Sequence, residues 1–229
     1  MNDLLVANAV VVDGSGTPGR PGSILVRGDR VAAVLRPGQA EPEVSRRFDA
    51  GGRVVAPGFV DVHQHSDVTP FVEPGMDSML RQGVTSVVVG NCGGSAFPFE
   101  GVREHAAMAG AEDLRLAPWT TFAGYLAAID AARPALNVAA LVGHGTLRET
   151  VLGRLDRAAI PEGLDAMRRL LAGAMDDGAV GMSSGLIYVP GLHASTDELV
   201  EVACGLGGRA CEHVIHLTSE PQARNLASN

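Results

Sequence analysis

The 229-residue sequence contains no lysine, so all 18 of its basic side chains are arginine. Its 26 acidic residues leave a net charge of −8 at pH 7. A chain with this balance has no basic stripe that could displace counterions from phosphates. We therefore expect no nucleic-acid partner.

Long apolar runs and regularly spaced cysteines are also missing. No apolar stretch reaches the ~18 residues that a transmembrane helix requires. The start, Met1-Asn2-Asp3, lacks the basic residues and apolar core of a signal peptide. The three cysteines are irregularly spaced, which argues against a disulfide framework and for a reducing compartment. These absences predict a cytoplasmic protein with no membrane partner, and they leave its oligomeric state open.

Residues 1–57 are expected to form a small domain of β-strands. Residues 4–12 are strongly β-forming. Residues 23–27 and 30–35 flank Gly28-Asp29, which is a signal for a hairpin with a two-residue turn. No chemistry is visible in this part of the chain.

Residues 58–229 show strands that alternate with helices, which is typical of a parallel sheet. Eight such units would close a TIM barrel of ~250 residues. Only five strands can be counted, so we predict a partial (β/α) barrel, about five of eight strands, in a truncated chain. The expected strands are 59–63, 85–89, 138–142, 179–183 and 214–217, and the main expected helices are 76–82, 122–132, 164–176 and 196–204.

His63 and His65 stand at the end of the first of these strands. Side chains at positions i and i+2 of a strand point to the same face, so the two imidazoles can lie side by side as ligands of a metal ion. A lone histidine is more often an ordinary half-buried residue. Two on one face, behind the Pro57-Gly58 turn and followed by Asp67, favour a metal site.

Cys92 follows the second strand between glycines, in Gly90-Asn91-Cys92-Gly93-Gly94. A lone cysteine is usually a small buried hydrophobic residue. Here the glycines allow the backbone to approach a ligand closely, and a thiolate is a good zinc ligand. Cys92 is therefore a third candidate ligand.

The segment from Pro57 to His65 resembles the first barrel strand of the amidohydrolase superfamily. Gly90 to Gly93, Gly143 to Arg148 and Ser183 to Gly191 resemble its D-aminoacylase (N-acyl-D-amino-acid deacylase) branch. This resemblance, which extends from residue 4 to about residue 220, implies a metal-bearing TIM barrel and a small β-sandwich built from both chain ends. Residues 1–57 would then be half of that composite sandwich.

The resemblance also implies a ligand set for Zn²⁺, as one or two ions. In this branch the cysteine takes the place that a carbamylated lysine occupies in hydantoinase-like relatives, and this chain has no lysine. His216 resembles the histidine ligand of the fifth strand, although His213 competes for that role. The implied metal ligands are His63, His65, Cys92 and His216.

Three further residues are candidates for substrate contact. His144, just past the third strand in Gly-His-Gly, either contacts substrate or is a turn histidine bonded to backbone. Ser184 and Tyr188 follow the fourth strand and are placed in the acyl or amino-acid pocket. Asp67 is either an outer carboxylate or a helix cap, and His105 is expected to be a loop residue without a role.

The implied reaction is zinc-assisted hydrolysis of an N-acyl-D-amino acid, a small-molecule substrate, to a carboxylate and a D-amino acid. Zinc lowers the pKa of a bound water and polarises the amide carbonyl. The family's catalytic aspartate and its later histidine ligand have no counterpart in this sequence, so we expect little or no turnover by this chain alone. The alternatives are a cyclic-amide hydrolase of the hydantoinase or dihydroorotase type, which Cys92 and the missing lysine disfavour, and a non-catalytic truncated remnant.

Overall fold

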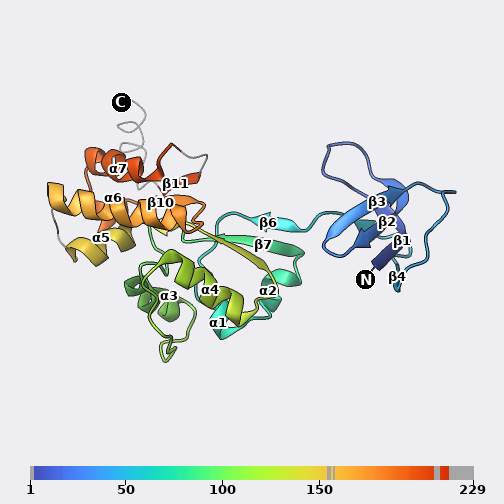
Figure 1. Cartoon of the computed structure of the whole chain (residues 1–229), viewed down its shortest axis with the longest axis horizontal. Helices are drawn as coiled ribbons and strands as arrows, with labels where there is room; N and C mark the ends of the chain where they lie inside the picture. The colour runs from blue at the N-terminus through green and yellow to red at the C-terminus, as the bar shows by residue number, and fades with distance from the viewer. Residues whose placement is uncertain (1–2, 154–155, 157, 209–211, 217–229) are drawn as a thin grey trace. The chain divides into compact units, whose positions relative to one another are not determined.

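The computed structural model describes residues 3–153, 156, 158–208 and 212–216, the last five by their backbone alone (Figure 1). The chain divides into two compact units, Met1–Gly58 and Phe59–Asn229. Each unit has its own buried core and is described by itself.

The first unit is a five-stranded sheet around β1 (Asp3–Val11). β1 pairs antiparallel with β2 and parallel with both β4 and β5. The predicted hairpin is confirmed: β2 and β3 pair antiparallel across the two-residue turn, with Gly28 in the left-handed region at φ +60°. The remaining strands are β2 (Arg20–Arg27), β3 (Arg30–Leu35), β4 (Arg46–Asp49) and β5 (Val54–Val55).

The second unit is built on parallel strands, as the alternating pattern predicts. One sheet has the order β6-β7-β8 and the other has the order β9-β10-β11. Leu141 separates β8 from β9, and its N–H donates to the Val89 carbonyl at 2.9 Å. The strands are β6 (Phe59–Asp61), β7 (Val84–Val89), β8 (Asn137–Ala140), β9 (Val142–Gly143), β10 (Gly181–Gly185) and β11 (Glu212–His216).

Helices connect these strands, and α6 and α7 lie side by side (Figure 1). They are α1 (Thr69–Val72), α2 (Asp77–Leu80), α3 (Val102–Met108), α4 (Phe122–Ala132), α5 (His144–Leu152), α6 (Pro161–Asp176) and α7 (Thr196–Ala203). Short 3₁₀ turns occupy Phe99–Gly101, Gly191–His193 and Cys204–Leu206.

Local sequence explains the two longest helices. α4 begins after Thr121, whose hydroxyl accepts from the Gly124 N–H at 3.0 Å. α6 begins with Pro161, which has no N–H to leave unsatisfied. Met167, Leu171 and Met175 recur at helical spacing, and their side chains are buried in the core of the second unit.

The structure corrects three expectations about elements. The first strand of the second unit ends at Asp61, so the two histidines follow the strand rather than belong to it. His144 is the first residue of α5, not part of a tight turn. His105 lies on α3, a helix that the sequence pattern did not reveal because only seven residues form it.

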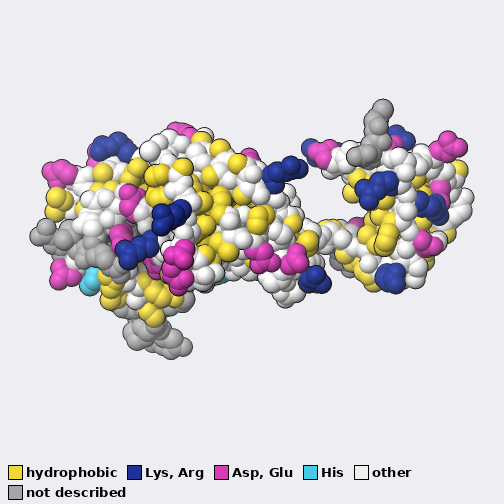
Figure 2. Space-filling model, turned by 90° about the horizontal axis from the view of Figure 1, so that it is seen from below, with side chains coloured by type: hydrophobic (Ala, Val, Ile, Leu, Met, Phe, Trp, Pro, Cys, Tyr) yellow, Lys and Arg dark blue, Asp and Glu magenta, His cyan; other side chains and the backbone are white. Residues whose placement is uncertain are grey.

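Within the described residues, every helix is too short or too polar to cross a bilayer. On the face drawn in Figure 2, acidic and basic side chains are interspersed, with no broad basic patch. This distribution agrees with the net charge of −8.

Candidate metal centre

The carboxyl ends of the parallel strands in the second unit surround a cavity of about 330 Å³. Ligands of parallel α/β proteins bind at this end of the strands, where the connecting loops meet. The walls come from the segments that follow β6, β7, β9 and β10, together with α3. The lining residues include His65, Cys92, Gly94, His105, Thr146 and Tyr188.

Three candidate metal ligands come together at this cavity. One donor atom each from His63, His65 and Cys92 lies within 4.8 Å of the other two. The His63 Nε2 atom is 3.2 Å from the Cys92 Sγ atom, and the two imidazole rings meet edge to face with centroids 5.7 Å apart. Nitrogen, nitrogen and sulfur in this arrangement are a donor set that suits Zn²⁺.

Hydrogen bonds hold the histidine segment against the segment that follows β7. The Asp61 carboxylate accepts from the His63 N–H at 3.1 Å. The buried Asn91 amide donates to the Val62 and Gln64 carbonyls, which flank His63, at 3.4 and 3.3 Å. Asn91 therefore fixes the backbone on both sides of His63, a role that its position beside Cys92 does not reveal in the sequence.

The backbone at Cys92 adopts a conformation that few side chains accept. Its φ is +56°, in the left-handed region, and Gly90 and Gly93 nearby have φ of +81° and +77°. A Cβ on Gly185 would lie 1.9 Å from the Cys92 carbonyl oxygen, so only glycine lets β10 pass this close. A non-glycine residue held in such a conformation is a common mark of a functional site.

Partial burial raises the pKa of the Cys92 thiol above its ordinary value. The thiol is therefore protonated at neutral pH in the metal-free protein. A bound cation reverses this preference, because a coordinated thiol loses its proton.

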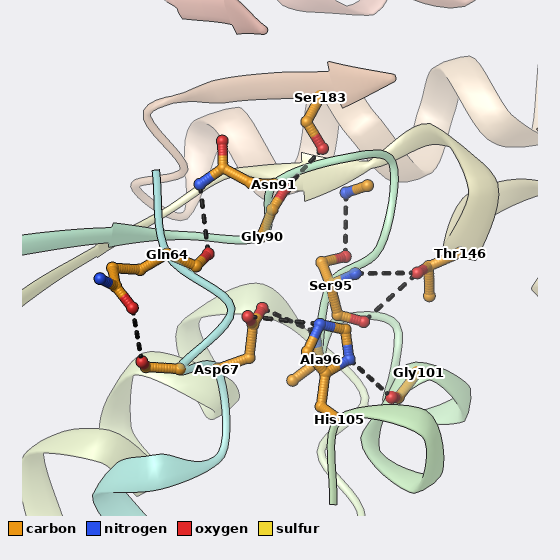
Figure 3. Close-up of polar contacts among 12 residues, drawn as sticks. Gln64, Asp67, Gly90, Asn91, Ser95, Ala96, Gly101, His105, Thr146 and Ser183 are labelled. Carbon is orange, nitrogen blue, oxygen red and sulfur yellow. Dashed lines mark hydrogen bonds and ion pairs between the residues drawn. The ribbon is translucent and has the colours of Figure 1, made fainter. Parts of the chain in front are cut away.

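The loop that carries Cys92 is anchored by buried serines. The Ser183 hydroxyl on β10 donates to the Gly90 carbonyl and accepts from the Gly93 N–H at 3.0 Å. The Ser95 hydroxyl accepts from the Gly143 N–H at 2.9 Å, and the Ser95 N–H donates to the Thr146 hydroxyl at 3.0 Å (Figure 3). Ser183 is therefore an anchor of this loop.

The predicted substrate-contact residues occupy different environments. Tyr188 is half exposed and lines the cavity. Ser184 is fully buried in β10. His144 is also fully buried, with Nε2 3.0 Å from Glu198 Oε1 on α7, and neither of these two is among the described residues that line the cavity.

Glu198 ties α5 to α7. Its carboxylate accepts from Arg148 Nη1 at 2.6 Å and from the Ala159 N–H at 3.0 Å. Burial raises its pKa, but the hydrogen bonds from His144, Arg148 and Ala159 outweigh burial and leave the pKa below its ordinary value. The carboxylate is therefore ionised at neutral pH.

His216 is the last residue of β11, and its backbone lies in register with Gly185 of β10. This places the His216 backbone at the carboxyl end of the neighbouring parallel strand. Its side chain, and that of His213, lie outside the described residues.

Asp67 and His105 form a buried pair at the cavity wall. The sequence offers Asp67 as an outer carboxylate but gives no sign of its pairing with His105. The Asp67 carboxylate does not cap α1, whose N-cap residue is Val68. Instead its Oδ2 atom lies 3.3 Å from His105 Nε2 (Figure 3). The position of Asp67, two residues after His65, is the only signal in the sequence that it belongs to the site.

Comparison with known proteins agrees with this geometry. Residues 46–210 match the model of the amidohydrolase family. An N-acyl-D-glutamate deacylase from Alcaligenes xylosoxydans xylosoxydans is 43% identical over 96% of this chain. The alignment covers 45% of that relative, so the chain spans about half the length of the curated relatives it matches.

Solved structures of similar proteins superpose closely on the chain. A D-aminoacylase crystal structure gives a TM-score of 0.84 at 37% identity, over 98% of this chain and 47% of the other. The N-acyl-D-glutamate deacylase of Bordetella bronchiseptica, complexed with zinc and a phosphonate inhibitor, gives 0.83 at 38% identity over 95% of this chain and 45% of the other. On sequence and structure together, the chain belongs to the amidohydrolase family.

Proposed function

We propose that this chain supplies the first metal ligands and part of the substrate cavity of a zinc-dependent deacylase of N-acyl-D-amino acids. The observation that carries the proposal is the convergence of His63, His65 and Cys92 within 4.8 Å at the cavity. The three side chains come from two segments separated by more than 25 residues, so their meeting is a product of the fold.

The residues present fit a zinc ion. Two imidazoles and one thiol occupy three of the four positions around a tetrahedral ion. His216, at the end of the adjoining strand, is the proposed further protein ligand, and the site would hold one or two ions. The Bordetella relative supports this choice, since its structure is complexed with zinc.

The second unit is proposed to form five consecutive strands of a (β/α)₈ barrel, over residues 58–229, with β8 and β9 as one strand interrupted at Leu141. Parallel strands that follow one another in chain order support this arrangement. Residues 1–57 would be half of a composite β-sandwich. The relatives support it too, because the superposition covers nearly the whole chain.

When zinc is bound, it activates a water molecule and polarises the substrate carbonyl. The chain's own residues would position the substrate around that centre. Tyr188 presents its phenol to the cavity and is proposed to contact the acyl or amino-acid part of the substrate. Ser184 and His144, both buried, are proposed to contribute by holding the strand ends that carry the cavity wall.

The relatives support the proposed substrate class, since one is named an N-acyl-D-glutamate deacylase and another a D-aminoacylase. Hydrolysis of cyclic amides is the alternative function. Cys92 in place of a bridging lysine, in a chain without lysine, counts against it.

Zinc binding and recognition of a substrate mimic test the proposal together. We expect the 229-residue chain to bind about one equivalent of zinc. We also expect the zinc-bound chain, but not the zinc-free chain, to bind a phosphonate analogue of an N-acyl-D-amino acid in preference to the L-isomer of that analogue. Calorimetric titration measures both steps, and Cys92→Ser is the control expected to weaken both strongly. Failure to bind zinc, or preference for a hydantoin over the D-phosphonate, would contradict the proposal.

A further inference from the structure

Asp67 and His105 are almost completely buried, with 1% and 2% of their side chains exposed. Burying a carboxylate and an imidazole costs free energy unless each group compensates the other. His105 is also part of the cavity wall, where its ring packs next to Gly94.

The contacts of the ring fix the position of its protons. His105 Nδ1 lies 3.0 Å from the Gly101 carbonyl oxygen, which can only accept, so Nδ1 carries a proton. Nε2 faces the Asp67 carboxylate at 3.3 Å. These two atoms form an ion pair when the ring is protonated.

Asp67 connects the two segments that carry the metal donors. It stands two residues after His65, and its Oδ1 atom accepts from the Ala96 N–H, four residues after Cys92, at 3.3 Å (Figure 3). The Tyr125 hydroxyl on α4 donates to the Asp67 carbonyl at 3.0 Å. One buried side chain thus joins the histidine segment, the cysteine loop and α3.

We propose that Asp67 and His105 are positioning residues, which set the spacing between the His63/His65 segment and the Cys92 loop. His105 holds the Asp67 carboxylate in the orientation that accepts the Ala96 N–H. Neither residue donates to the metal. The inference rests on the proposed metal site, and outer residues of this kind typically change metal affinity 10–100-fold.

Cobalt(II) binding to His105→Ala tests this role, because the thiolate-to-cobalt charge-transfer band reports the geometry of the donor set. We expect affinity about tenfold weaker than that of the unsubstituted chain and a weaker band at saturation. Leu171→Ala is the control for loss of stability alone, because Leu171 lies on α6 and its side chain is fully buried in the core of the second unit. Its affinity for cobalt and the intensity of its charge-transfer band should both stay within twofold of those of the unsubstituted chain.

The inference is overturned when His105→Ala binds cobalt like the unsubstituted chain, or when Leu171→Ala weakens binding to the same degree. If His105→Ala fails to fold, His105→Gln replaces it, because glutamine fills most of the same space. The affinity of His105→Gln for cobalt should be at least threefold weaker than that of the unsubstituted chain.

Hydrogen exchange separates this inference from the proposed metal site. In the metal-free chain, the Ala96 amide should exchange at least tenfold faster in the His105 variant, while unchanged exchange would refute the positioning role. An unsubstituted chain that binds no cobalt would refute the metal site, and the Ala96 amide would still decide the role of the pair.

Discussion

At the scale of single residues, Cys92 shows more features of a metal ligand than any other described residue of the site. Its backbone is in the left-handed region, its carbonyl lies where a Cβ on Gly185 would clash, and its sulfur lies 3.2 Å from His63 Nε2. A buried structural cysteine needs none of these features. Together they favour a ligand role.

The raised pKa of Cys92 predicts a pH-dependent metal affinity. Binding must displace the thiol proton, so affinity should rise about tenfold per pH unit below that pKa. The range from pH 7.5 to 8.5 lies below the raised pKa of the Cys92 thiol. Zinc competition with a chelator indicator across this window measures the slope.

Cys92→Ser serves as the matched variant for that slope. It should bind zinc at least about a hundredfold more weakly, since even residues outside the ligand set cost up to that much. Its affinity should also be nearly independent of pH in this window. A slope equal to that of the unsubstituted chain would exclude Cys92 as a ligand.

At the scale of elements, the site depends on close contact between β10 and the Cys92 loop. Gly185→Ala would place a methyl carbon 1.9 Å from the Cys92 carbonyl oxygen, and neither backbone can yield easily. We expect the free energy of unfolding to fall by about 1–3 kcal/mol, as for other overpacked sites, together with weaker zinc binding. Denaturant unfolding and zinc titration measure the two effects.

Gly173→Ala is the control for this substitution. Gly173 lies inside α6, and a Cβ there has no neighbour within 4 Å. Alanine should stabilise the helix by about 0.5–1 kcal/mol and leave zinc binding unchanged. Equal destabilisation by both substitutions would refute the close approach at Gly185.

The buried Glu198 carboxylate predicts how α5 and α7 respond to acid. Because its folded-state pKa is lowered, its stabilising contribution is present above the unfolded pKa and is lost as the pH falls through the folded value. At pH 7, Glu198→Gln should cost about 3–5 kcal/mol, since it removes the carboxylate that compensates the buried Arg148.

Urea unfolding at pH 7 and below pH 4 checks this contribution. The difference between the unsubstituted chain and Glu198→Gln should shrink in acid. A difference that stays constant with pH would show that Glu198 acts through packing rather than charge.

At the scale of the whole molecule, a metal ion would join segments that lie far apart in the sequence. Zinc that binds only the folded chain should stabilise it by about 2.7 kcal/mol at a free concentration one hundred times its dissociation constant. Urea unfolding with zinc and with a chelator measures this difference. His63→Ala should abolish it, and a zinc effect that survives in His63→Ala would indicate binding elsewhere.

The sequence by itself predicted the parallel β/α order, the N-terminal hairpin, the three donor residues and the family. The first three follow from local signals, namely hydrophobic periodicity, Gly-Asp at the turn, and His63, His65 and Cys92 at strand exits. The family follows from the resemblance of its motifs. It also predicted α4 over residues 122–132, because Thr121 caps that helix locally.

Tertiary structure alone decided how the donors are held and which other residues surround them. The histidines lie beyond β6, so Asn91 and Asp61 rather than strand pleating bring their rings together. The pairing of Asp67 with His105 joins residues 38 positions apart, as a side-chain contact between a loop and a short helix. No periodic pattern encodes such contacts, because they arise from packing between elements rather than from the propensity of either one.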